Sequence, residues 1–96
     1  MNQVLEKTKL RKLEFGENPK DGERVIRVLS TSGDDRYAWD KRFLDQVHEA
    51  RDEFYAMRKK GYAAYLPGKG GGRGQLITEF DPDAEEILFV GPVQGG

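Results

Sequence analysis

The last two residues of the chain, Gly95 and Gly96, are the feature best suited to chemistry. A C-terminal carboxylate is adenylated only if it reaches into a narrow active site, and two residues without side chains give the thinnest chain for that purpose. Pro92 would stiffen the start of this tail, and Val93 and Gln94 follow it. We therefore predict a carrier or conjugation site at the glycines, with residues 92–94 binding a partner. The alternative is an unstructured terminus without chemistry.

Two other segments carry clustered polar groups. Residues 68–74, "GKGGGRG", could surround an anion, but a phosphate loop needs Ser or Thr after its Lys and a helix behind it. We expect a flexible hairpin loop there, with nucleic-acid contact by Lys69 and Arg73 as a weaker alternative. Residues 81–86, "DPDAEE", place several carboxylates close together, as a hard cation would require. They lack the glycine and the spacing of a calcium-binding loop, so we expect a solvated acidic turn.

Several function classes are not expected. His48 is the only histidine, the chain has no cysteine, and nothing marks a nucleophile beside an oriented base. We predict no enzyme activity, no metal and no cofactor. The 16 basic and 17 acidic residues give a net charge of -1, so no global field attracts nucleic acid or an anionic membrane. The longest apolar run, residues 87–90, is far too short to span a bilayer, and we expect a soluble cytoplasmic protein.

A chain of 96 residues has material for one small core. The β-branched segment Val25–Ser30 predicts a strand, which the five-residue loop "TSGDD" joins to a second strand, "RYAWD", in a hairpin. Residues 62–66, 75–80 and 86–90 predict three more strands. The last of these is apolar on both faces, which is typical of a central strand.

One helix is expected after the hairpin. Asp40 would cap it, and Trp39 would pack on Leu44 as a hydrophobic staple. Gly61 would end it. The spacing of apolar residues predicts one buried face, made of Phe43, Val47, Ala50, Phe54 and Met57. The aromatic residues are expected to form the core rather than a docking surface: Tyr37, Trp39, Tyr62, Tyr65 and Phe80.

This order of elements resembles that of the β-grasp, or ubiquitin-like, fold. The resemblance implies an α+β domain in which a mixed sheet of four to five strands packs on one long helix, with the last strand beside the first. We place the core at residues 25–91 and the diglycine tail at 92–96. Residues 1–24 form an N-terminal arm and linker, either disordered or docked on a partner.

The C-terminal segment "AEEILFVGPVQGG" adds a second resemblance, to the small subunit of molybdopterin synthase and related sulfur carriers. In those proteins an acidic turn leads into the last strand, a proline-containing exit and a terminal diglycine. The resemblance implies that a partner enzyme adenylates the Gly96 carboxylate for sulfur transfer or for conjugation to an amine. Gly91 departs from the pattern, because a proline is common there, and so does the long N-terminal arm.

A third resemblance leads to a different function class. The segments "GDDRYAWD", "KKGYAAY" and "EFDPDAEEI", with the terminal glycines, resemble short proteins of bacteria and their phages that have no assigned role. The alternative hypothesis is therefore a non-catalytic adaptor, such as a virion or assembly component, that docks through residues 1–24. The expected partner is an adenylating enzyme under the first hypothesis and an assembly neighbour under the second.

Overall fold

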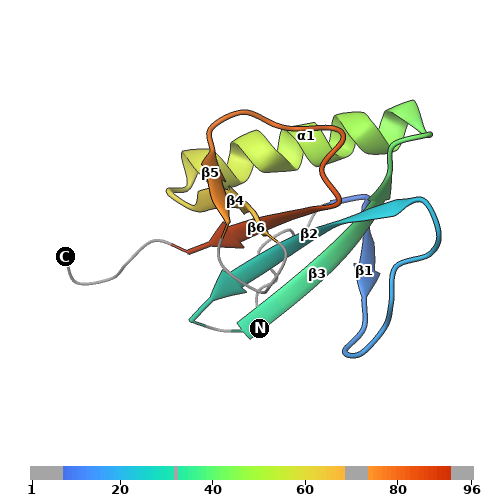
Figure 1. Ribbon diagram of the computed structural model, residues 1–96, viewed down its shortest axis with the longest axis horizontal. Helices are drawn as coiled ribbons and strands as arrows, with labels where there is room; N and C mark the ends of the chain where they lie inside the picture. Colours follow the sequence, from blue (N-terminus) through green and yellow to red (C-terminus); the bar gives the residue numbers. More distant parts are fainter. Residues whose placement is uncertain (1–7, 32, 69–73, 92–96) are drawn as a thin grey trace.

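The computed structural model describes residues 8–31, 33–68 and 74–91 of the chain. A single mixed sheet lies under one helix, which crosses one of its faces (Figure 1). The strand order across the sheet is β1-β3-β2-β6-β4-β5, and the α+β class is confirmed. In chain order the elements are β1 (Arg11–Leu13), β2 (Glu23–Ser30), β3 (Gly33–Asp40), α1 (Leu44–Lys59), β4 (Ala63–Leu66), β5 (Gln75–Ile77) and β6 (Glu86–Val90).

Strands β2 and β3 form the predicted hairpin. Their antiparallel pairing runs from Glu23 opposite Asp40 to Ser30 opposite Gly33. The five-residue loop expected at 31–35 is wrong, because residues 33–35 already belong to β3. The hairpin is therefore tighter and its strands longer than the β-branched residues alone indicated.

Strand β6 lies in the middle of the sheet, as its apolar sequence predicted. It pairs in parallel with β2 on one side and antiparallel with β4 on the other. Ile87 and Phe89 are fully buried in the core, while Leu88 and Val90 are half-buried on the opposite face. One face of β6 thus packs in the core, the other lies on the opposite side of the sheet, and both faces carry apolar side chains.

The core lies between the sheet and α1. Phe54 of the helix is fully buried, and its ring centroid lies 5.5 Å from that of Phe89 and 5.9 Å from that of Phe80. Tyr37 and Trp39 are also buried, so their expected core role is confirmed. Tyr62 and Phe80 pack against the border of this core. Tyr65 pairs with Leu88, which places it on the face turned away from α1.

The start of α1 differs from the prediction. Phe43 occupies the N-cap, no side chain caps the helix, and the helix begins at Leu44. Asp40 instead ends β3, and its carboxylate accepts hydrogen bonds from the Arg42 backbone N–H at 2.9 Å and the Arg42 Nη2 at 2.7 Å. The cap prediction is wrong for two reasons. Residues 41–43 lie between the end of β3 and the start of α1, and Arg42 binds the Asp40 carboxylate.

Exposure also corrects the predicted helix face. Leu44 is 68% exposed and cannot staple the fully buried Trp39, and Phe43 is 52% exposed. The remaining four positions follow the prediction, because Ala50, Phe54 and Met57 are buried and Val47 packs partly against them. The apolar period was correct from the second helical turn onward.

The predicted stop at Gly61 is confirmed. Gly61 has φ +97°, a conformation that favours glycine. Its N–H donates to the Arg58 carbonyl at 3.0 Å, and the Tyr62 N–H donates to the Met57 carbonyl at 3.1 Å. These two bonds form a Schellman motif, which satisfies carbonyls left free at the end of α1.

The segment considered as an arm contains an additional strand. Strand β1 pairs antiparallel with β3; Leu13 at its end and Leu10 directly before it are buried. In the described part of the chain the sheet therefore has six strands, where four to five were expected. The domain boundaries at residues 24/25 and 91/92 stay a prediction, although β2 already begins at Glu23.

Truncating the central aromatic residue of α1 should weaken the fold strongly. We expect Phe54→Ala to lower the free energy of unfolding by about 3–5 kcal/mol, because it removes a buried ring and leaves a cavity. Leu76→Ala is the control, since Leu76 is 56% exposed and its loss should change that energy by at most about 0.5 kcal/mol. Urea unfolding followed by circular dichroism measures both. Similar losses in the two variants would contradict this placement of the core.

The contact between Asp40 and Arg42 makes the free energy of unfolding depend on pH. Hydrogen bonds from the Arg42 side chain and then from its backbone N–H lower the pKa of Asp40 from 3.8 to about 2. The ionised carboxylate therefore stabilises the fold above pH 3.8, and this contribution is lost as pH falls towards about 2. We expect Asp40→Asn to unfold at lower urea than the wild type at pH 7 and to lose less stability below pH 4. An unchanged pH profile in Asp40→Asn would contradict the assignment.

Candidate functional site: the C-terminal end of strand β6

The residues predicted to carry the chemistry lie outside the described part of the chain. This applies to the glycines, Gly95 and Gly96, and to the tail residues Pro92, Val93 and Gln94. The last described residue is Gly91, directly after β6. The structure therefore defines the base of the candidate site and its surroundings.

Gly91 is fixed to the neighbouring strand. Its N–H donates to the Leu29 carbonyl at 2.9 Å, which continues the contact between β2 and β6 by one residue. A Cβ atom at this position would lie 3.3 Å from Cε2 of Tyr62 and 3.4 Å from the Leu29 carbonyl oxygen. Proline has no N–H and would lose this bond. The departure from the sulfur-carrier pattern at position 91 thus has a structural reason in this chain.

Tyr62 brings the end of α1 to the same place. Its carbonyl accepts a hydrogen bond from Nη1 of Arg58 at 2.9 Å, and its own N–H belongs to the Schellman motif. The helix C-terminus, the start of β4 and the end of β6 therefore converge at the base of the tail. These contacts hold Gly91 in a defined position.

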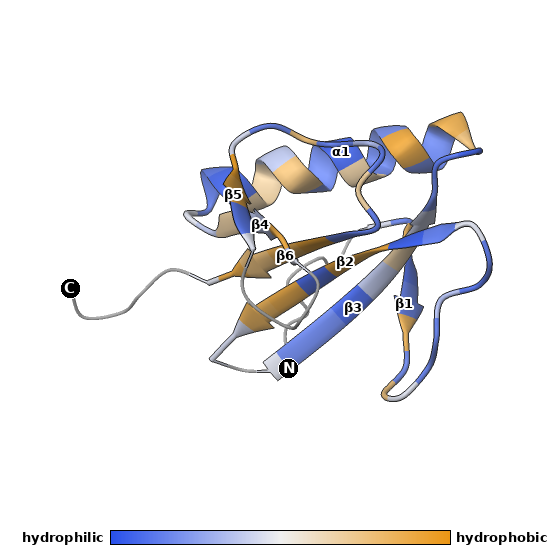
Figure 2. Cartoon of the chain, in the orientation of Figure 1, coloured by the Kyte–Doolittle hydropathy of each residue, from blue (hydrophilic) through white to orange (hydrophobic). Residues whose placement is uncertain are grey.

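An apolar sheet surface adjoins this base. Cross-strand pairing sets Leu29, Val90 and Ala63 in one row on the face opposite α1. A second row contains Arg27, Leu88 and Tyr65, and the partly exposed Leu76 continues it on β5. The ends of β2 and β6 are hydrophobic in Figure 2. Such a surface can bind a protein, and we define these seven residues as the open sheet face.

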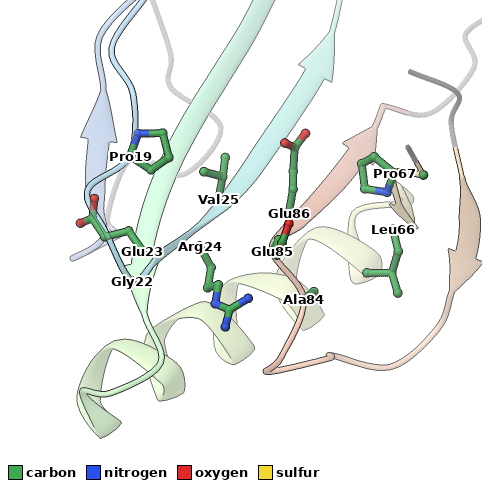
Figure 3. Close-up of a pocket in the computed structure, with 11 residues that line it drawn as sticks. Pro19, Gly22, Glu23, Arg24, Val25, Leu66, Pro67, Ala84, Glu85 and Glu86 are labelled. Carbon is green, nitrogen blue, oxygen red and sulfur yellow. The ribbon is translucent and has the colours of Figure 1, made fainter. Parts of the chain in front are cut away.

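An open hollow lies at the other end of β6. Arg24, Leu66, Pro67, Ala84, Glu85 and Glu86 are among the residues that line it (Figure 3). Arg24 uses Nη1 to bind the Asp83 carbonyl at 3.1 Å, so this side chain holds the acidic turn against β2. Because Glu86 begins β6 and Gly91 follows its end, the hollow is separate from the base of the tail.

The other residues that the sequence suggested for chemistry do not form a metal site in the described part of the chain. The Asp81 carboxylate accepts the Asp83 N–H at 2.9 Å, and Asp83 forms an exposed ion pair with Lys41 at 3.0 Å, which fits the expected solvated turn. Within residues 8–31, 33–68 and 74–91, no three His, Cys, Asp or Glu side chains are placed to hold a metal ion. His48 lines a polar hollow between α1 and β1. Lys69 and Arg73 lie outside the described residues.

Sequence reasoning missed one polar cluster. The guanidinium of Arg11 in β1 forms ion pairs with Glu17 at 2.6 Å and with Glu23 at 2.5 Å. A signal for it was visible, because Gly-Glu occurs twice with a spacing of six residues, at 16–17 and at 22–23. Only the fold shows that both carboxylates meet the same cation.

No known protein family matches this chain, and no curated protein or solved structure shows significant similarity to it. Among the described residues, no helix has the length and apolar character needed to cross a membrane. Because no relative indicates a role, only the geometry of the described residues bears on the function of this chain.

The N–H of Gly91 provides a test of how the tail is anchored. Gly91→Ala and Gly91→Pro both add a Cβ beside Tyr62, but only the proline removes the donor to Leu29. We expect Gly91→Pro to lower the free energy of unfolding by about 1 kcal/mol more than Gly91→Ala, since the Leu29 carbonyl loses its hydrogen bond. Urea unfolding of the two variants measures the difference. Equal stabilities would mean that this bond does not hold the base of the tail.

Proposed function

We propose that this protein is a ubiquitin-like carrier or modifier that acts through the carboxylate of Gly96. The strand order β3-β2-β6-β4-β5, with α1 between β3 and β4 in the chain, supports assignment to the β-grasp fold. In this assignment β1 is an addition that extends the sheet beyond β3. The parallel contact between the first hairpin strand and the last strand is the arrangement that the fold requires.

The observation that carries the proposal is the position of β6. A buried central strand ends at Val90, and Gly91 is tied to Leu29 directly before the predicted tail. The tail therefore starts from a fixed point beside the open sheet face. An adenylating enzyme that takes up the tail would contact this apolar face at the same time.

The proposed chemistry belongs to partner enzymes, with this chain as the substrate. A carboxylate oxygen of Gly96 attacks the α-phosphorus of ATP, and pyrophosphate leaves. A persulfide sulfur of the partner then attacks the acyl adenylate and AMP leaves; reduction of the resulting acyl disulfide by a thiol releases the thiocarboxylate. In the conjugation variant a lysine amine attacks the carbonyl of the acyl adenylate, AMP leaves, the nitrogen loses a proton, and an isopeptide bond forms. Both routes require that Gly96 carries the free terminal carboxylate.

The adaptor hypothesis has separate support. Strand β1 and the loop after it fold against the sheet edge and leave Phe15 fully exposed. Deleting residues 1–24 is a poor test of docking, because it would remove β1 and the buried Leu10 and Leu13. Point substitutions on the exposed surface of this segment are the appropriate test.

Intact mass spectrometry of the protein from its source organism tests the carrier proposal. We expect a fraction in which sulfur replaces one carboxylate oxygen, or else a Gly-Gly remnant on lysines of target proteins. Gly96→Ala should remove either product, because a side chain obstructs a site shaped for glycine. Gly68→Ala is the matched control, since a Cβ there meets no atom within 4 Å. An unmodified carboxylate, no conjugates and no effect of Gly96→Ala would overturn the proposal.

A further inference from the structure

Phe15 is the most exposed large apolar residue among those described, at 105% of the reference exposure. It lies in the connection between β1 and β2, which extends past the edge of the sheet (Figure 1). A flexible loop could turn such a side chain inward or let it move freely. The hydrogen bonds around Phe15 instead hold the backbone of this segment in one conformation, from which the side chain extends into solvent.

A tight turn sets the direction of the Phe15 side chain. The Glu17 N–H donates to the Glu14 carbonyl at 2.9 Å, which closes a β-turn over residues 14–17. Gly16 is the third residue of this turn and has φ +81°, as a type II turn requires of that position. Phe15 is therefore fixed at the corner of the turn, away from the core.

A second turn repeats the arrangement six residues later. The Glu23 N–H donates to the Lys20 carbonyl at 2.9 Å, and Gly22 has φ +88°. In each turn the final glutamate also accepts a hydrogen bond from the N–H of the first residue. Glu17 binds the Glu14 N–H at 2.9 Å, and Glu23 binds the Lys20 N–H at 2.7 Å.

Two arginines attach this pair of turns to the sheet. Arg11 of β1 binds both Glu17 and Glu23. The hydrogen bond from the Glu14 N–H and then the bond from Arg11 lower the pKa of Glu17, and the bond from Arg11 lowers the pKa of Glu23. Arg36 of β3 donates from Nη2 to the carbonyls of Glu14 at 3.0 Å and Glu17 at 2.7 Å. Side chains from two strands, β1 and β3, thus hold the turn that contains Phe15.

An exposed aromatic side chain on a backbone that is already held in place is suited to binding. The turn needs little further ordering when the ring enters a pocket, and aromatic residues are common among the residues that contribute most to interface energy. Three carboxylates and two guanidinium groups surround Phe15. Glu14 and Asp34 are exposed, Glu17 pairs with Arg11, and Arg36 lines the same shallow hollow as Phe15 and Asp34, which leaves a small excess of negative charge. Such a surface is repelled by anionic lipid and attracted by basic side chains.

We propose that the turn at residues 14–17 is a docking element, which inserts Phe15 into an apolar pocket of another protein whose rim carries Lys or Arg. The proposal does not depend on the chemistry of Gly96, and the two tests fail independently.

The first step of the test identifies the contacted protein. Phe15 is replaced in the full chain by the photo-crosslinking residue p-benzoylphenylalanine, and Leu44 is replaced in the same way as a control. Leu44 is also exposed, but it is the first residue of α1 and lies outside both the turn and the open sheet face. After irradiation in the source organism, we expect a protein adduct from position 15 that is absent from position 44, identified by mass spectrometry.

The second step measures affinity with the identified protein in purified form. We expect Phe15→Ala to weaken binding at least about thirtyfold, since truncating an interface hot spot costs a factor of this order. Leu44→Ala should leave binding unchanged. Arg11→Gln should weaken binding although Phe15 is retained, because the turn loses its brace. Higher salt should weaken wild-type binding, as expected for an acidic surface against a basic rim.

Other results overturn the proposal. No adduct specific to position 15, or an affinity within twofold of wild type for Phe15→Ala, excludes docking by this turn. An adduct of two copies of this chain would assign Phe15 to self-association. Vesicles of phosphatidylcholine and phosphatidylglycerol that bind the wild type but not Phe15→Ala would assign it to a membrane. Melting temperatures of all variants confirm that each one is folded.

Discussion

The parallel pairing of β2 with β6 is the constraint on which the rest of the structure depends. It extends from Val25 opposite Glu86 to Leu29 opposite Val90, and it joins the N-terminal hairpin to the C-terminal strands. Parallel neighbours cannot be connected by a tight turn, so the chain between them must cross the sheet. Helix α1 makes that crossing and covers the inner face. Because β6 is central, its end also fixes the position of Gly91, the last described residue.

The sequence predicted those elements whose signal is local. The β-branched run in β2, the apolar strand β6, the period of Ala50, Phe54 and Met57, and the stop at Gly61 depend on neighbouring residues and are present in the structure. Strand β1 could not be told from a short helix in the sequence, because it has three residues and becomes a strand only through its pairing with β3. The Asp40 cap failed for a local reason, since Arg42, two residues later, binds the same carboxylate.

Only part of the candidate site could be predicted from the sequence. The diglycine can be recognised in the sequence, whereas the role of Gly91 depends on the Leu29 carbonyl, which lies far away along the chain. The bracing of the Phe15 turn also depends on the fold. The repeated Gly-Glu pattern indicates two similar turns, but nothing local indicates that Arg11 and Arg36 reach them from two different strands. Residue types therefore indicate which chemical groups are present, and strand register determines which of these groups come into contact.

Register also relates the two proposed sites to each other. Strand β1 is antiparallel to β3, β3 to β2, and β2 is parallel to β6, so β1 and β6 run in the same direction. Leu13, Arg36, Arg27 and Leu88 form one row across these strands. Phe15 and Gly91 both follow that row and leave the sheet at the same end. Three strand spacings separate β1 from β6, about 14 Å. Beyond that row the twist of the sheet turns β1 away from β6, as Figure 1 shows, so the surface at Phe15 and the surface at the end of β6 face different directions.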